Sequence, residues 1–366
     1  MIGIQLELNI YNLKIINHIM KLIPKIKFAF IVLPSFLFSS TLFAQNVDPV
    51  VDPHIDSHVR AFLKVLNSTP GKPIEQLSPV EARAVLTKVQ KSVPVDLSGV
   101  TTSEKTINQD GIMVKLTIVK SISFKAGGPV FMFFHGGGWV LGDFFTHQRM
   151  VRDLVVNSGV SAVFVNYTPS PEAHYPVAIN EAYAATKWVA NHGTEIGLNG
   201  KKLAVVGNSV GGNMATVVCL MAKEKKSPEI TYQVLLWPVT DANFETQSYN
   251  QYGEGRFLTK KMMIWFWDNY TMDPAQRKEI YASPLQASVE QLQNLPKAMV
   301  ITDGNDVLRD EGLEYARKLD AAGVSVVNVE YNGMIHDWGL LNPLSEVPAT
   351  KASLFQVGQE LKKALQ

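Results

Sequence analysis

The segment 202–215, KLAVVGNSVGGNMA, limits most strongly how this 366-residue chain can fold. Its apolar residues 203–206 are typical of a short buried strand, and the pattern of 214–223 is helical. Between them, 207–211 predict a sharp turn with Ser209 at its tip. A β-carbon on either flanking glycine would crowd the neighbouring strand or helix. The segment therefore predicts a strand, a turn and a helix that present a serine hydroxyl.

The pentad G-x-S-x-G alone says little, because it should occur by chance in roughly one chain in ten of this length. Its setting is more informative. Short apolar runs alternate with helical segments such as 182–190 and 311–322, as expected for parallel strands covered on both faces. The pattern predicts an α/β fold with a mostly parallel central sheet flanked by helices. The apolar runs are 130–134, 162–165, 203–206, 232–236, 298–301 and 324–329.

Two signals concern the ends of this sheet. Residues 106–108 and 113–119, on either side of Asp110-Gly111, predict a β-hairpin. The last apolar run is interrupted by Ser325 and Asn328, which favours a position near the sheet edge.

Two regions with helical patterns do not belong to the alternation of strands and helices, and they predict a cap. Residues 48–94 contain two amphipathic helices separated by a Pro- and Gly-rich loop at 68–73. A further helical pattern at 257–270, rich in Met and Trp, interrupts the alternation of strands and helices. We therefore expect a cap over the sheet edge, built from 45–100 and the insertion 241–287. The α/β core would then comprise 101–240 and 288–366.

Residues 1–44 are predicted to be a targeting segment. Lys21, Lys25 and Lys27 precede an apolar stretch at 28–43, and Ala44-Gln45 is a plausible cleavage point. Met20 is a better start for such a signal than Met1, and an uncleaved anchor is the alternative. The interpretation predicts a periplasmic or secreted protein with no stable membrane insertion after cleavage.

Composition excludes several other classes. The formal net charge is +1 and no basic block is present, so nucleic-acid binding is not indicated. Cys219 is the only cysteine, so an intrachain disulfide cannot form. Its apolar neighbours predict a packing role.

The motif His135-Gly-Gly-Gly-Trp139 follows the first apolar run. Consecutive glycines allow backbone N–H groups to turn towards one point, and attack by Ser209 on a carbonyl would need such donors for the oxyanion. The N–H groups of Gly137 and Gly138, with that of Val210, are predicted to form this oxyanion hole. A plain flexible loop is the alternative.

Ser209 also needs a base and an acid. Of the eight histidines only His336 follows it, as the hydrolase order of serine, acid and histidine requires. The acid is expected on a loop between the two. Asp303 and Asp306 both qualify, whereas Asp310 is more typical of a helix start.

Together these motifs resemble those of the hormone-sensitive-lipase-like branch of the α/β-hydrolase family, the bacterial carboxylesterases and acetyl hydrolases. The resemblance runs from about Asp52 to the C-terminus. It implies that Asp306 completes a triad with Ser209 and His336. It also implies hydrolysis of a small-molecule ester with a short to medium acyl chain, without a metal or organic cofactor. The segments that carry it are 135–139 HGGGW, 207–212 GNSVGG, 306–312 DVLRDEG and 333–336 GMIH.

The chain departs from the family pattern in four places. Asn208 replaces an aspartate, which removes a charge beside the site, and Val210 replaces an alanine. The segment NYTPSPE at 166–172 lacks the family's arginine, which is expected to cost an ion pair and to leave Glu172 without a known partner. Val307 replaces a usual proline. None of these changes removes a predicted catalytic group.

Aromatic residues near the motifs are candidates for an apolar acyl or alcohol pocket. For the three from the insertion, core packing of the cap is an equal alternative. The candidates are Trp139, Phe144, Phe145, Tyr175, Trp265, Phe266 and Trp267.

Other functions remain compatible with the same residues. An amidase or a lactonase could use the same triad, since a harder leaving group needs only firmer protonation by the histidine. A catalytically silent binding protein on this fold is a further alternative, which the presence of His336 disfavours. A homodimer is also compatible with the sequence.

Overall fold

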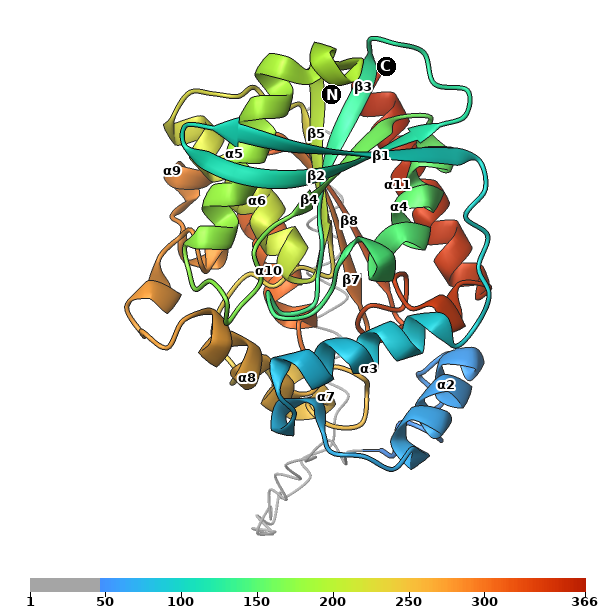
Figure 1. Ribbon diagram of the computed structural model, residues 1–366. Coiled ribbons are helices and arrows are strands. Elements are labelled where there is room, and N and C mark those ends of the chain that lie inside the picture. Colours follow the sequence, from blue (N-terminus) through green and yellow to red (C-terminus); the bar gives the residue numbers. More distant parts are fainter. Residues whose placement is uncertain (1–46) are drawn as a thin grey trace, which may run out of the picture. The chain divides into compact units, whose positions relative to one another are not determined.

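An eight-stranded sheet lies at the centre of the computed structural model, which describes residues 47–366 (Figure 1). The strand order is β1-β2-β4-β3-β5-β6-β7-β8. Neighbours from β4 to β8 are parallel, whereas β2 pairs antiparallel with β1 and β4. The predicted α/β fold with a mostly parallel sheet is confirmed. The strands are β1 Val100–Gln109, β2 Ile112–Ser121, β3 Gly128–Phe134, β4 Ser161–Asn166, β5 Leu198–Asn208, β6 Tyr232–Leu236, β7 Lys297–Asp303 and β8 Val326–Tyr331.

The predicted hairpin is formed by β1 and β2, and its strands are longer than the sequence indicated. Asp110 and Gly111 both have positive φ, 54° and 86°. A two-residue turn of this kind matches the twist of the flanking strands, which explains the Asp-Gly pair. At the other end, β8 is an edge strand, as its polar interruptions predicted.

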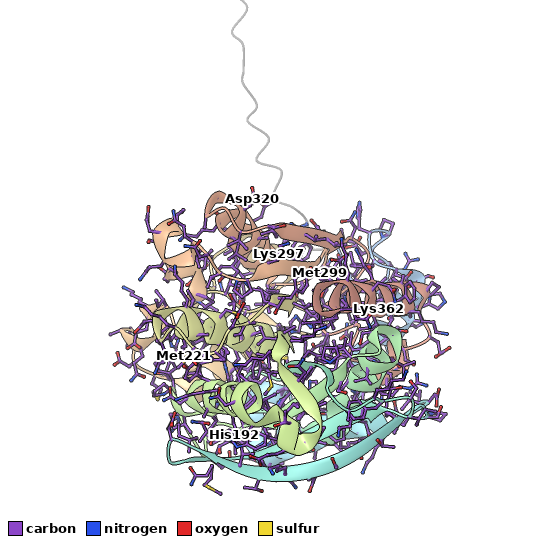
Figure 2. All side chains as sticks on the ribbon, turned by 90° about the horizontal axis from the view of Figure 1, so that it is seen from above. His192, Met221, Lys297, Met299, Asp320 and Lys362 are labelled. Carbon is purple, nitrogen blue, oxygen red and sulfur yellow. The ribbon has the colours of Figure 1, made fainter. Side chains whose placement is uncertain are left out.

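Helices cover both faces of the sheet. One face packs against α5 (Val177–His192), α6 (Val210–Glu224) and α10 (Arg309–Ala321), and the other against α4 (Phe144–Ser158) and α11 (Pro348–Leu365). Alternate residues of β3 point to the two faces, as the period of a strand requires. In Figure 2, Met221 of α6 and Lys362 of α11 lie on opposite sides of the sheet.

Helices α2 (Ser57–Ser68), α3 (Pro79–Lys91), α7 (Gln247–Tyr252) and α8 (Lys260–Tyr270) lie together at one end of the sheet (Figure 1). Buried Asp52 and Arg256 form an ion pair at 2.8 Å, and the rings of Phe62 and Phe257 lie 6.3 Å apart. The N-terminal segment and the insertion therefore contact each other, and we call them the cap.

Helix α8 begins later than its apolar pattern predicted. Phe257 lies outside the helix with a φ of 75°, and Thr259 caps it by accepting a hydrogen bond from the N–H of Met262 at 3.1 Å. A cap of this kind satisfies a donor of the first turn, so the side chain at 259 rather than the apolar pattern sets the helix start.

Short elements complete the described chain. Among residues 47–366, no helix has the length and apolar character needed to cross a bilayer. The predicted targeting segment 1–44 lies outside the described residues and stays a prediction. The short elements are η1 Ile74–Gln76, η2 Gly193–Ile196, η3 Gln276–Lys278, η4 Pro284–Gln286, α9 Val289–Leu292 and η5 Asn342–Leu344.

Candidate active site

Ser209 lies at the turn between β5 and α6, with a φ of 55° and a ψ of −123°. The turn is as tight as its glycines indicated. A β-carbon on Gly207 would lie 2.0 Å from the carbonyl oxygen of Gly211, and one on Gly211 would lie 1.9 Å from that of Phe134. Helix α6 begins at Val210, not at Met214 as the apolar pattern predicted. The helix N-terminus therefore starts directly at the serine.

Three side chains from separate loops meet at this turn. The hydroxyl of Ser209 donates to Nε2 of His336 at 2.9 Å, and Nδ1 of His336 donates to Oδ2 of Asp306 at 2.7 Å. Ser209 is 3% exposed, and His336 and Asp306 are each 2% exposed. Asp306 follows β7 and His336 follows β8, so the loops beyond the carboxyl ends of three strands supply the group. The arrangement can transfer a proton from a serine nucleophile.

Asp303, the rival acid, does not contact His336 in this way. Its Oδ1 accepts a hydrogen bond from Nε1 of Trp338 at 2.7 Å. Burial, and then the nearby charge of Asp306, raise the pKa of Asp303 well above its usual range, so its neutral form is favoured. Asp310 lies in the first turn of α10, as expected for a helix start.

The environment of His336 favours its protonated form. Burial alone would lower the pKa of the imidazole, but the charges of Asp306 and Asp337 and the hydrogen bond to Asp306 outweigh it. The pKa of His336 is therefore raised above its usual value. A base of this kind binds the serine proton more firmly than an isolated histidine would.

The loop after β3 has a left-handed backbone at three consecutive residues. Gly137, Gly138 and Trp139 have positive φ values of 106°, 64° and 59°. Within residues 47–366, the N–H groups of Gly137 and Gly138 donate to no protein acceptor. Val210 is the first residue of α6, so its N–H has no partner inside the helix. These three groups are available to an oxyanion.

The cap packs directly onto this loop. A β-carbon on Gly138 would lie 2.1 Å from ring atoms of Phe266 in α8. Behind the loop, His135 stacks on Tyr167 with ring centroids 4.1 Å apart, and burial lowers the pKa of His135 to about 4. A neutral imidazole therefore supports the loop at ordinary pH.

Three of the seven predicted pocket residues, Trp139, Tyr175 and Trp267, form one buried aromatic group with Tyr270. Trp139 stacks on Tyr270 with centroids 3.9 Å apart, and Trp267 and Tyr175 approach the same group edge-on. Phe266 packs on Gly138, and Trp265 lies beside it at 5.2 Å.

Phe144 and Phe145 do not join this aromatic group. Phe144 packs edge-on against Phe164, on the α4 side of the sheet. Phe145 is exposed beneath the ammonium of Lys91. Both residues lie in the first turn of α4.

Glu172, whose partner the sequence left uncertain, forms a bidentate ion pair with Arg83 of α3 at 2.6 and 2.7 Å. The same guanidinium donates to the carbonyl oxygens of Val140 at 2.7 Å and Ser170 at 3.0 Å. The sequence analysis missed Arg83 because it lies 89 positions before Glu172. An arginine from the cap thus holds the end of the glycine loop.

We expect Arg83→Ala to destabilise the protein by about 2 kcal/mol, because two carbonyl groups lose their donor. The exposed ion pair with Glu172 contributes little to that value. Activity should fall roughly tenfold, since the loop that carries the predicted oxyanion donors loosens. Urea unfolding and ester turnover measure the two effects.

Two controls accompany this variant. Arg83→Lys should recover only part of the loss, because an ammonium cannot reproduce the fork of donors. Arg317→Ala breaks an exposed ion pair with Glu314 and should change stability by less than about 0.5 kcal/mol. If Arg83→Ala and Arg317→Ala changed stability and activity equally, Arg83 would not hold the glycine loop in place.

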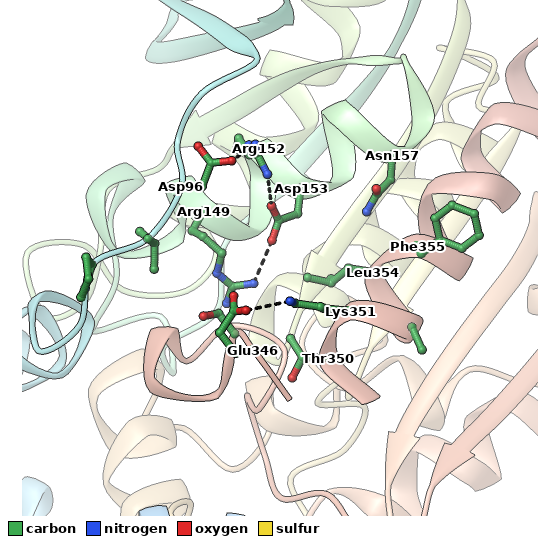
Figure 3. A pocket seen from close by; sticks show the side chains of 14 residues that line it. Asp96, Arg149, Arg152, Asp153, Asn157, Glu346, Thr350, Lys351, Leu354 and Phe355 are labelled. Atoms are coloured by element: carbon green, nitrogen blue, oxygen red, sulfur yellow. Dashed lines mark hydrogen bonds and ion pairs between the residues drawn. The ribbon is translucent and has the colours of Figure 1, made fainter. Parts of the chain in front are cut away.

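A separate surface cavity of about 710 Å³ lies between α4 and α11 (Figure 3). Its charged side chains are paired with one another: Arg152 with Asp96 and Asp153, Arg149 with Asp153, and Lys351 with Glu346. None of the residues that meet at the serine turn lines it. The cavity therefore offers no unpaired charge for a ligand.

Among residues 47–366, only Asp303, Asp306 and His336 form a group with the residue types of a metal site, with donor atoms within 4.8 Å of one another. Nδ1 of His336 and Oδ1 of Asp303 already take part in hydrogen bonds with protein groups. A cation would have to displace the proton on Nδ1. These hydrogen bonds leave the three side chains occupied by protein partners.

Comparison with known proteins identifies the family to which this fold belongs. Residues 131–340 match a family model described as alpha/beta hydrolase fold. A thermostable esterase from Pseudomonas putida ECU1011 is 64% identical, with a TM-score of 0.85 over 86% of this chain and 99% of that one. The alpha/beta hydrolase R526 of Acanthamoeba polyphaga mimivirus is 38% identical over 87% of this chain and 88% of its own length. Carboxylesterase NlhH of Mycobacterium tuberculosis is 29% identical over 89% and 98%. The chain therefore belongs to the α/β-hydrolase family, in its hormone-sensitive-lipase-like branch.

Proposed function

We propose that this carboxylic ester hydrolase is a serine esterase that cleaves short to medium acyl esters through an acyl-enzyme. Ser209 is the nucleophile, His336 the base and Asp306 the acid. The observation that carries the proposal is the continuous hydrogen-bonded path from the Ser209 hydroxyl through His336 to Asp306, at 2.9 and 2.7 Å. Relatives named as esterases support the reaction class.

The proposed reaction has two stages. Nε2 of His336 takes the proton of Ser209 as Oγ attacks the ester carbonyl carbon, and Asp306 stabilises the imidazolium that forms. The N–H groups of Gly137, Gly138 and Val210 bind the oxyanion, each contributing about 3 kcal/mol. The imidazolium then gives its proton to the alkoxide that leaves. Water, deprotonated by the same nitrogen, attacks the acyl group and releases the acid and the Ser209 hydroxyl.

The restricted acyl length is supported by the cap. Ser209 is 3% exposed, and Phe266 packs on Gly138 at the mouth of the proposed oxyanion hole. A long acyl chain would have to displace α8. The test uses residues 45–366 with p-nitrophenyl acetate, butyrate, octanoate and palmitate, together with matched anilides and lactones. We expect the highest kcat/KM with acetate or butyrate; faster turnover of the anilides or lactones would favour an amidase or lactonase.

We expect Asp306→Asn to lower kcat by about 10³- to 10⁴-fold, because the amide no longer stabilises the imidazolium. Asp303→Asn is the matched control. Asp303 is favoured in its neutral form, which an amide resembles, so kcat should change less than about tenfold. Steady-state kinetics with one ester compares the variants. The larger loss in Asp303→Asn would mean that we have assigned the acid wrongly.

We expect kcat/KM to fall on the acid side with an apparent pKa above the usual histidine value of about 6.5. His336 must be neutral to accept the serine proton, and its raised pKa means that this form is lost as the pH falls through a higher value. A pH–rate profile, corrected for spontaneous hydrolysis, measures the limb. An apparent pKa below 6.5 would contradict the role of the surrounding carboxylates.

A further inference from the structure

A second carboxylate lies beside the proposed base. Oδ2 of Asp337 is 3.8 Å from Nε2 of His336, the nitrogen that accepts the Ser209 proton in the proposed reaction. Asp337 is 6% exposed and has a φ of 58°. This left-handed conformation costs a non-glycine residue about 1 kcal/mol or more, so the surrounding contacts must hold it.

Two neutral donors hold Asp337. Its Oδ1 accepts hydrogen bonds from Nε1 of Trp237 at 2.7 Å and from Nδ2 of Asn208 at 2.9 Å. Both fall on the same oxygen, so Oδ2 remains directed to His336. In the described part of the chain, no lysine or arginine forms an ion pair with Asp337. When His336 is protonated, its imidazolium is therefore the cation that this buried carboxylate can stabilise electrostatically.

Asn208 connects the carboxylate to the glycine loop. Its Oδ1 accepts a hydrogen bond from the N–H of Gly136 at 3.0 Å, while its Nδ2 donates to Asp337. The family's aspartate at 208 would place a second carboxylate against Asp337 with no donor between them. Asn208 lacks the carboxyl group of the family's aspartate, and the structure places a carboxyl group close by at position 337.

We propose that Asp337, held by Asn208 and Trp237, is a positioning residue that stabilises the imidazolium form of His336 during acyl transfer. The proposal rests on the proposed function, because it assigns His336 as the base. Asp306 orients the ring through Nδ1, and Asp337 acts on the opposite nitrogen. The pair Asn208 and Asp337 also links the base to the loop that carries the oxyanion donors.

Three other carboxyl groups lie near His336. Asp303, the last residue of β7, and Asp306, in the loop that follows, face it from one side, and burial raises the pKa of Asp303. From the cap, Asp56 packs on Gly333, three residues earlier in the same loop. The raised pKa of His336 agrees with the geometry, since after burial Asp306 and then Asp337 are its main causes.

The first test is Asp337→Asn, which removes the charge but keeps an oxygen acceptor. We expect the acid limb of kcat/KM to move down by roughly one pH unit. We also expect kcat to fall roughly tenfold above the limb, with KM little changed, because the imidazolium is stabilised less in the transition state. Asp320→Asn, an exposed change on α10, is the control and should leave the limb in place. An unmoved limb in Asp337→Asn overturns the proposal.

NMR titration of the His336 ring measures the change in the pKa of His336 directly, without ester turnover. It separates the two proposals: if no ester is hydrolysed, the esterase function fails while the titration still decides the role of Asp337. A downward shift in Asp337→Asn supports the role, and an unchanged value overturns it.

A charge swap tests the pair when the single variant does not fold. Asn208→Asp alone should lower kcat, because the new carboxylate at position 208 would repel that of Asp337 and would no longer donate a hydrogen bond to it. Adding Asp337→Asn restores one donor and one carboxylate and should recover at least part of that loss. Additive losses in the two variants would show that positions 208 and 337 act independently, against the proposal.

Discussion

Replacing Ser209 with alanine is expected to reduce kcat for ester hydrolysis by about 10⁶-fold, the loss seen when a serine hydrolase loses its nucleophile. Without the hydroxyl, His336 has no proton to take and no acyl-enzyme forms. The predicted oxyanion donors and substrate binding remain, so residual hydrolysis should stay above the uncatalysed rate. Turnover of p-nitrophenyl butyrate measures the loss. An organophosphonate that labels the wild-type serine should leave the variant unlabelled by mass spectrometry.

Ser353→Ala is the matched control for this variant. Ser353 is also a buried serine. Its hydroxyl donates to the carbonyl oxygen of Thr350 in α11, away from the turn that carries Ser209. Its loss should leave kcat within about twofold, because the group takes no part in the reaction. Ser209→Ala should keep the wild-type circular dichroism spectrum. A well-folded Ser209→Ala protein that still hydrolyses esters at the wild-type rate would refute the serine mechanism.

The second large effect concerns stability. We expect Gly211→Ala to lower the free energy of unfolding by more than about 4 kcal/mol, or to prevent folding. The new β-carbon would lie 1.9 Å from the carbonyl oxygen of Phe134 and 2.6 Å from its carbonyl carbon. Both atoms belong to the backbone at the end of β3, so no side-chain movement relieves the contact. The clash would push the glycine loop away from the serine turn. Urea unfolding measures the change.

Two other glycines separate this clash from general effects of alanine. Gly71 has open space around it and no positive φ, so Gly71→Ala should change stability by less than about 0.5 kcal/mol. Gly159 also has open space but a φ of 70°, so Gly159→Ala should cost about 1 to 2 kcal/mol from backbone strain alone. If Gly211→Ala were no worse than Gly159→Ala, close backbone packing would not explain the glycine at 211.

The predicted boundaries differ from the structure where contacts override local preference. Helix α6 starts at Val210, although two glycines in its first turn are poor helix formers. Those glycines permit the contacts with β3 and with Pro238 that hold the helix start in place. A pattern of apolar residues carries no information on such contacts, so the sequence analysis began the helix at Met214.

The choice between Asp303 and Asp306 as the acid also depended on tertiary contacts. Asp303 ends β7 and Asp306 lies in the loop that follows, and residues three positions apart there can point in different directions. Family resemblance favoured Asp306, and the structure brings it to 2.7 Å from His336 while Asp303 bonds to Trp338. Phe144 and Phe145 lie away from the cap aromatics because sequence proximity to the glycine loop does not determine where a helix directs its side chains.

The sequence by itself determined the fold class, the serine turn, the glycine loop and the histidine that follows the last strand. These depend on local properties: the periods of strands and helices, the conformational freedom of glycine, and the order of motifs along the chain. Only the tertiary structure decided the partners of Arg83 and Asp337. Arg83 lies 89 positions from Glu172, and Asn208 lies 129 positions from Asp337. A single sequence has no local signal for contacts at such separations, because folding alone brings these side chains together.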